Sequence, residues 1–164
     1  MAILARNEIL GKIKQGKIKI EPFNEKNIGP GSVDLTLGND FWAYNKKRRI
    51  EVSENTNYLD YTVRKKGNIA LNPGEFVIGI TQEKITLPDN ICGLLSGRSR
   101  FARLGILVHA TASFIQPGIS NHQVLEIKNI SPNVIILKPG LKVCQLALSE
   151  MKGKGKYIGR FARQ

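Results

Sequence analysis

Hydrophobic and polar residues alternate along most of the chain with the two-residue period of β-strands. Residues 7–14 differ, because Ile9, Leu10 and Ile13 recur there at helical spacing and Gly16 follows as a stop signal. A short amphipathic helix is therefore expected near the N-terminus. After it, short apolar segments follow one another at a spacing of about ten residues, and Gly, Pro or Asn separates them.

The expected strands each show alternation or a short apolar run, and they cover residues 18–20, 32–37, 41–44, 69–71, 75–81, 84–87, 91–95, 106–112, 122–129, 134–137 and 142–148. Residues 38–40 are predicted to form a hairpin turn. The sequences at 72–74 and 138–140 share Pro-Gly chemistry typical of a type II turn. Residues 45–68 are polar and predict a long loop with one strand near 49–52. Together these features predict an all-β barrel or jelly-roll sandwich.

With 164 residues, the chain is long enough to bury a core without disulfides or metals. One domain is expected over residues 1–164, with its helix within 1–16 and a mobile basic tail over 150–164. Cys92 and Cys144 are isolated among apolar neighbours, which favours buried free thiols. The apolar runs are shorter than the ~20 residues of a membrane helix. The N-terminus lacks a signal-peptide pattern, so a cytoplasmic protein without membrane contact is expected.

The charge balance of the chain favours an anionic partner. It has 25 Lys and Arg residues against 13 Asp and Glu residues, a formal net charge of +12. Nucleic acid or a small polyanion such as a nucleoside triphosphate would suit that charge. However, the lysines are spread along the whole chain, and no aromatic-rich platform accompanies them. A solvated surface is therefore favoured over a nucleic-acid-binding stripe.

Residues 94–128 contain the densest candidate chemistry. Gly97, Arg98, Ser99, Arg100 and Arg103 follow an apolar stretch that reads as a buried strand. A strand that ends in Gly-Arg-Ser and turns briefly helical presents backbone N–H groups, a hydroxyl and guanidinium groups to an anion. The sequence therefore predicts a phosphate site at this turn.

A single carboxylate, Glu126, stands inside the apolar run formed by Val124, Leu125 and Ile127. If it is buried beside the arginines, it can act as a general acid or base.

Several segments, in order and at matching spacing, make the chain resemble the dCTP deaminase branch of the dUTPase-like superfamily. They are IKIEPF at 18–23, GPGSVDLTLG at 29–38, LNPGEFVIGIT at 71–81, the stretch 87–118, VLEIKN at 124–129, KPGLKVCQL at 138–146, and Lys156-Tyr157. The resemblance covers nearly the whole chain.

The resemblance implies a distorted β-barrel or jelly-roll of the dUTPase-like type, assembled as a homotrimer whose active sites lie where subunits meet. It also implies deamination of dCTP to dUTP and ammonia without zinc, with Mg²⁺ bound only with the triphosphate. The chain lacks the His-x-Glu and Cys-x-x-Cys signature of the zinc deaminases. His109 and His122 are too few and too far apart for a metal site, and His109 is expected to be a packed strand residue.

The resemblance also implies catalytic roles for four positions. Glu126 matches the general acid/base, which takes a proton from the attacking water and returns it toward the cytosine amino group. Ser99 and Arg103 match residues that position the water and the base. The backbone at Ala112 matches the group that holds the water.

Five further positions match substrate-binding residues of the family. Arg98 and the position of Arg100 correspond to the triphosphate-binding turn. Lys156 and Tyr157 correspond to the C-terminal segment that folds over the nucleotide. Gln116 stands beside the deoxyribose, where the family normally carries Asp.

Three departures leave alternatives open. Gln116 cannot act as a base, which argues against dUTP hydrolysis more than against deamination. Arg100 replaces a small hydroxyl residue, and the segment between Leu148 and Lys156 is shorter than in typical deaminases. The alternatives are a dUTP diphosphatase, a bifunctional deaminase–diphosphatase, and a non-catalytic nucleotide-binding relative. A basic nucleic-acid-binding module is the least favoured.

Overall fold

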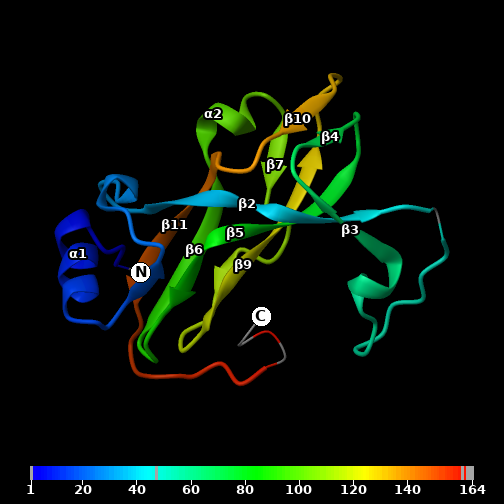
Figure 1. Ribbon diagram of the computed structural model, residues 1–164. Coiled ribbons are helices and arrows are strands. Elements are labelled where there is room, and N and C mark those ends of the chain that lie inside the picture. Colours follow the sequence, from blue (N-terminus) through cyan, green and yellow to red (C-terminus); the bar gives the residue numbers. More distant parts are fainter. Residues whose placement is uncertain (1, 47, 160, 162–164) are drawn as a thin grey trace.

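A curled antiparallel β-sheet forms the body of the protein in the computed structural model, which describes residues 2–46, 48–159 and 161 (Figure 1). Along its main path the strands are ordered β7-β9-β5-β2-β11-β6-β8, while β1 pairs with β5 and β3 with β2. Strands β4 and β10 pair separately. The strands are β1 (Lys19–Glu21), β2 (Val33–Tyr44), β3 (Thr62–Lys66), β4 (Ile69–Leu71), β5 (Phe76–Thr86), β6 (Ile91–Gly97), β7 (Ile106–Val108), β8 (Phe114–Ile115), β9 (Ser120–Asn129), β10 (Ile135–Leu137) and β11 (Lys142–Glu150).

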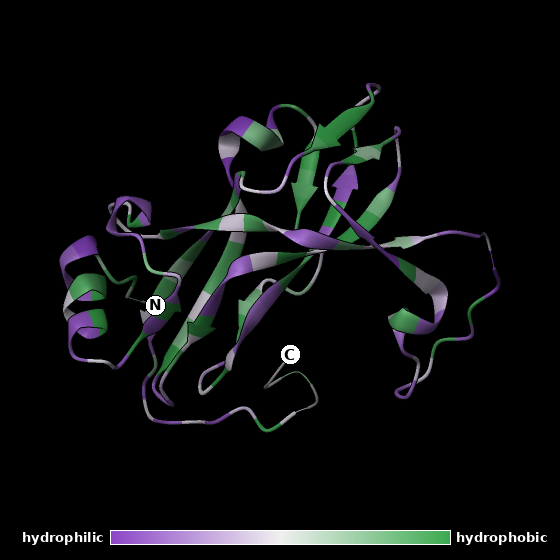
Figure 2. Cartoon of the chain, in the orientation of Figure 1, coloured by the Kyte–Doolittle hydropathy of each residue, from purple (hydrophilic) through white to green (hydrophobic). Residues whose placement is uncertain are grey.

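The helices are short and lie at the edges of the sheet. They are α1 (Arg6–Lys14), α2 (Ser99–Ala102) and the 3₁₀ turns η1 (Glu25–Asn27) and η2 (Tyr58–Tyr61). Figure 2 shows hydrophobic and hydrophilic stripes along α1, and Ile9 is fully buried on its inner side. The helix expected near the N-terminus is thus confirmed, as is the brief helical turn after Gly-Arg-Ser.

The hydrophobic core lies inside the curl of the sheet. Alternation along β2 buries Val33, Leu35 and Leu37, and Phe41 is the largest fully buried side chain. Both cysteines are buried free thiols, as expected, and burial raises the pKa of Cys144 to about 12. The all-β prediction is confirmed, and the strands form a distorted, partly closed barrel.

Residues 38–40 do not form the hairpin turn that their composition suggested. They continue β2, and they bulge where the pairing with β5 shifts between Leu37 and Phe41. Ile80 is the residue of β5 that faces this bulge, and a Cβ atom on Gly38 would lie 2.7 Å from the Ile80 carbonyl oxygen. Glycine is thus needed at position 38 for close backbone approach and not for a turn.

The Gly38→Ala substitution is expected to lower the free energy of unfolding by about 1–3 kcal/mol, because the added methyl group collides with backbone. Gly11→Ala is the matched control, since nothing lies within 4 Å of its Cβ position in α1. Alanine there should stabilise the helix by up to about 1 kcal/mol. Urea unfolding followed by circular dichroism measures both changes. Equal stability of the two variants would contradict the close approach.

Other predicted boundaries also need correction. Residues 48–52 form no strand, and the strand of this region is β3, at Thr62–Lys66. The expected strands 75–81 and 84–87 are one continuous β5. The expected strand 106–112 ends at Val108, and β8 was not anticipated. The division of β5 into two expected strands has a physical cause: its pairing with β9 shifts between Ile80 and Lys84, and this bulge interrupts the alternation without ending the strand.

The two Pro-Gly turns match their prediction. Glu75 N donates to the Asn72 carbonyl and Leu141 N to the Lys138 carbonyl, while Gly74 and Gly140 have φ of +81° and +89°. A positive φ at the third residue is what a type II turn requires.

The described part of the C-terminal tail runs along the protein. Backbone hydrogen bonds join Met151 N, Gly155 N and Tyr157 N to the carbonyls of Asn90, Asp89 and Pro117. Residues 160 and 162–164 lie outside the described residues, and the mobility of the tail stays a prediction. None of the helices in the described ranges combines the length and hydropathy that a membrane span needs.

Candidate active site

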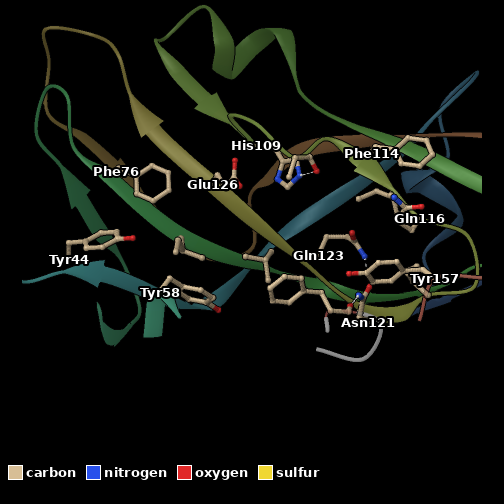
Figure 3. Close-up of a pocket in the computed structure, with 16 residues that line it drawn as sticks. Tyr44, Tyr58, Phe76, His109, Phe114, Gln116, Asn121, Gln123, Glu126 and Tyr157 are labelled. Carbon is tan, nitrogen blue, oxygen red and sulfur yellow. Dashed lines mark hydrogen bonds between the residues drawn. The ribbon is translucent and has the colours of Figure 1, made fainter. Parts of the chain in front are cut away.

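A pocket of about 530 Å³ opens on one side of β9 (Figure 3). This volume lies in the range that holds small-molecule ligands. The residues that line it come from β2, η2, β5, β8, β9, the loops around them and the C-terminal tail: Tyr44, Tyr58, Phe76, Ile78, His109, Ala112, Phe114, Ile115, Gln116, Ile119, Asn121, Gln123, Val124, Glu126, Tyr157 and Phe161. Four candidate residues are among them, namely Glu126, Ala112, Gln116 and Tyr157.

Glu126 is held on β9 with one carboxylate oxygen fixed. Its Oε2 accepts hydrogen bonds from the backbone N and the Oγ1 of Thr111, each at 2.8 Å. Its Oε1 has no hydrogen-bond partner among the described residues. Within one chain no arginine of the 98–103 turn lines the pocket beside Glu126, and the donors to its carboxylate come from Thr111. One fixed and one free oxygen suit a carboxylate that exchanges a proton with a ligand in the pocket.

His109 is not the packed strand residue that the sequence suggested. It follows the end of β7 with φ of +64°, which is uncommon for a residue other than glycine. Its backbone N donates to the Glu126 carbonyl at 2.9 Å, and its Nε2 lies 2.6 Å from the Ala112 carbonyl oxygen. His109 therefore fixes the 109–112 backbone, including the water-holding candidate Ala112, next to Glu126.

Aromatic side chains form one wall of the pocket, and sequence reasoning missed them. Tyr44 and Phe76 lie with ring centroids 6.2 Å apart, and Tyr58 packs edge-on against Trp42 at 6.5 Å. Burial raises the pKa of the Tyr58 hydroxyl above its ordinary value. The available signal was the Phe-Trp-Ala-Tyr run at 41–44, because such rings concentrate in ligand pockets as well as in cores.

The opposite end of the pocket is polar and is closed by the tail. Asn121 and Gln123 of β9 meet there, and the Asn121 Nδ2 donates to the Phe161 carbonyl at 2.7 Å. Tyr157 is half-buried in the same region, whereas Lys156 is exposed and does not line the pocket. Figure 3 shows Asn121, Gln123 and Tyr157 together at this end.

The arginine turn lies away from the pocket of its own chain. Arg98 pairs with Asp34 at 3.1 Å and donates to the Lys142 carbonyl at 3.0 Å. Ser99, Arg100 and Arg103 are exposed on and after α2, and none of them lines the pocket. In Figure 1, α2 lies at the top of the view and the C-terminal segment runs along the bottom. One chain therefore does not bring the two halves of the predicted site together.

The part of the chain that the structure describes contains no cluster of metal-ligating side chains. Within residues 2–46, 48–159 and 161, His, Cys, Asp and Glu form no group of three or more that could hold a metal ion.

Comparison with known proteins identifies the family. The model of the dCTP deaminase-like family matches residues 3–151. The dUMP-forming dCTP deaminase of Mycolicibacterium vanbaalenii is 38% identical over 94% of this chain and 84% of its own length. The enzyme of the same name from Methanosphaera stadtmanae is 40% identical over 92% of this chain and 80% of its own length.

A solved structure agrees at the level of the fold. The crystal structure of 2′-deoxycytidine 5′-triphosphate deaminase from Agrobacterium tumefaciens has a TM-score of 0.72 and 22% identity to this chain. The likeness covers 89% of this chain and 47% of the longer chain. From the family match and the identity over most of its length, the chain belongs to the dCTP deaminase-like family.

Proposed function

We propose that the protein deaminates dCTP, taken up with Mg²⁺ on its triphosphate, and converts it to dUMP, ammonia and pyrophosphate in the cytoplasm. The observation that carries the proposal is the free oxygen of Glu126 on the wall of a nucleotide-sized pocket. Relatives 38% and 40% identical are named for a dUMP-forming reaction. For that reason dUMP replaces the dUTP expected from the sequence as the final product.

Glu126 supplies the proton transfers of the first step. Its free oxygen takes a proton from a water, and the resulting hydroxide attacks C4 of the cytosine. The same carboxyl group then returns the proton to the departing nitrogen, the C–N bond breaks, and ammonia leaves. The Ala112 backbone and the Ser99 and Arg103 side chains are proposed to orient the water and the base.

In the second step another water attacks the α-phosphorus. The bond between the α-phosphorus and the oxygen that bridges it to the β-phosphate breaks, and pyrophosphate leaves. Gln116 is exposed at the pocket and can orient a water through its amide. It cannot take the proton of the attacking water, and the departing pyrophosphate is the group that accepts it. This residue favours the second candidate function, deamination that stops at dUTP.

We further propose a homotrimer in which the arginine turn of one subunit completes the pocket of the next. Arg98, Ser99, Arg100 and Arg103 would then meet the triphosphate and base bound beside Glu126. Support comes from the end of the protein that carries α2, where exposed apolar side chains gather: Leu104, Leu107, Ile130, Val134 and Ile136. Apolar groups exposed together mark a surface that contacts another protein.

The test is incubation with dCTP, and separately with dUTP, in Mg²⁺ buffer, with nucleotides resolved by ion-exchange chromatography. We expect dUMP and ammonia to appear from dCTP in equal amounts. Accumulation of dUTP from dCTP, with added dUTP left intact, would establish the second candidate instead. Unchanged dCTP would refute both and leave a non-catalytic nucleotide-binding protein.

A further inference from the structure

Two buried carboxamides form part of the pocket wall. Asn121 and Gln123, both on β9, are each 5% exposed and line the pocket. Polar side chains buried this deeply are normally satisfied by hydrogen bonds on all their polar atoms, and an unpaired one is costly. The hydrogen bonds of this pair therefore show which atoms remain for a ligand.

The direction of each hydrogen bond in the pair is fixed. The Phe161 carbonyl can only accept, so Asn121 must present its Nδ2 to it, at 2.7 Å. Asn121 Oδ1 then accepts from the Gln123 Nε2, also at 2.7 Å. The Gln123 side chain consequently keeps its Oε1 turned away from Asn121 (Figure 3), and this oxygen has no hydrogen-bond partner among the described residues.

A bulge brings Gln123 into the same pocket as Glu126, although an odd spacing along a regular strand would put the two on opposite faces. The pairing of β5 with β9 shifts here, so that Thr81, Gln82 and Glu83 together face Gln123 alone. The Gln123 backbone N is anchored on Thr81 Oγ1 at 2.9 Å. Such bulges re-aim side chains at functional sites.

The free Oε1 of Gln123 can accept a hydrogen bond from a donor group of the ligand, and its position on β9 indicates which group that is. Three strand positions separate it from Glu126, a distance of about 10 Å along β9. A cytosine nucleotide whose amino group lies at Glu126 therefore reaches Gln123 with its sugar. Phosphate oxygens are acceptors and would repel a carbonyl oxygen, whereas the sugar hydroxyls are donors.

We infer that Gln123 Oε1 accepts a hydrogen bond from a sugar hydroxyl of the substrate, and that Asn121 holds the Gln123 amide in the required orientation. The inference rests on the proposed function and adds to it a residue that recognises the sugar. Gln123 is thus a specificity residue, separate from the proton transfers at Glu126.

The test compares ammonia release from dCTP, CTP and 2′,3′-dideoxycytidine triphosphate by the wild-type protein and by Gln123→Met. For a contact with the 3′-hydroxyl, the substitution should lower kcat/KM for dCTP and CTP about three- to tenfold. The loss should appear mainly in KM, and the dideoxy substrate should be unaffected. A loss confined to CTP would place the contact at the 2′-hydroxyl, which dCTP lacks, and would overturn the inference for the proposed substrate.

Equal losses on all three substrates, or no loss on any, would overturn the inference while leaving the deaminase activity in place. A wild-type protein that releases no ammonia from any of them would overturn the proposed function, and the inference with it. Gln82→Met, an exposed amide on β5, is the matched control and should behave as wild type. Should Gln123→Met melt at a lower temperature, Gln123→Asn keeps the wall polar, withdraws the oxygen by one methylene and must give the same pattern.

Discussion

Replacing Glu126 with glutamine is expected to lower kcat for ammonia release from dCTP by about 10²- to 10⁴-fold, the contribution of a positioned general acid–base group. The amide has nearly the same shape, and its oxygen can still accept from Thr111, whose two donors lie 2.8 Å from Oε2. It cannot, however, take a proton from water. Binding of dCTP should therefore persist, and the loss should fall on kcat.

Steady-state ammonia release measures the loss, and titration calorimetry measures binding of dCTP to the variant. Glu54→Gln is the matched control, because Glu54 is exposed in the loop before η2 and does not line the pocket. It makes the same chemical change away from the site and should leave kcat unchanged. Full activity of Glu126→Gln would remove the carboxylate from the mechanism.

Much of the fold could be predicted because local chemistry and tertiary structure agree. The helical spacing of Ile9 and Ile13 ends at Gly16, and the Pro-Gly turns at 72–74 and 138–140 form as their composition requires. Gly38 shows where this agreement ends. Its sequence context resembles a turn, but the glycine is needed because the Ile80 backbone approaches it from a strand distant in sequence. Such contacts leave no local pattern.

The residues of the candidate site likewise fall into those that the sequence predicts and those that it does not. The carboxylate Glu126 could be found from its apolar neighbours, since a lone acid in such a run is conspicuous. The aromatic wall could be found only in part: the run at 41–44 contains Tyr44, but η2 brings Tyr58 to the pocket from a polar stretch without periodicity. His109 was misjudged for a related reason: its left-handed backbone ends the strand, and alternation alone does not reveal this.

Because Glu126 and the arginine turn lie apart within one chain, the second prediction is that two inactive variants recover activity when they assemble together. If each site takes Glu126 from one subunit and Arg103 from its neighbour, two inactive variants should restore each other. Glu126→Gln retains Arg103, and Arg103→Ala retains Glu126. In every closed trimer that contains both variants, one of the three interfaces combines the two intact residues. The activity of the mixed trimers should therefore rise from near zero to about a third of the wild-type value.

Co-expression of the two variants with different affinity tags, followed by purification through both tags in turn, isolates the mixed oligomers. Their ammonia release from dCTP is compared with that of each variant alone, and light scattering gives the oligomeric state. A monomer, or mixed oligomers no more active than the mean of the parents, would contradict a shared site. In that case Arg98 and its neighbours on α2 would have only the structural role suggested by the pairing of Arg98 with Asp34. Recovery of ammonia release, in contrast, requires the pocket and the arginine turn to meet across a subunit boundary. No single polypeptide in the mixture carries both an intact Glu126 and an intact Arg103.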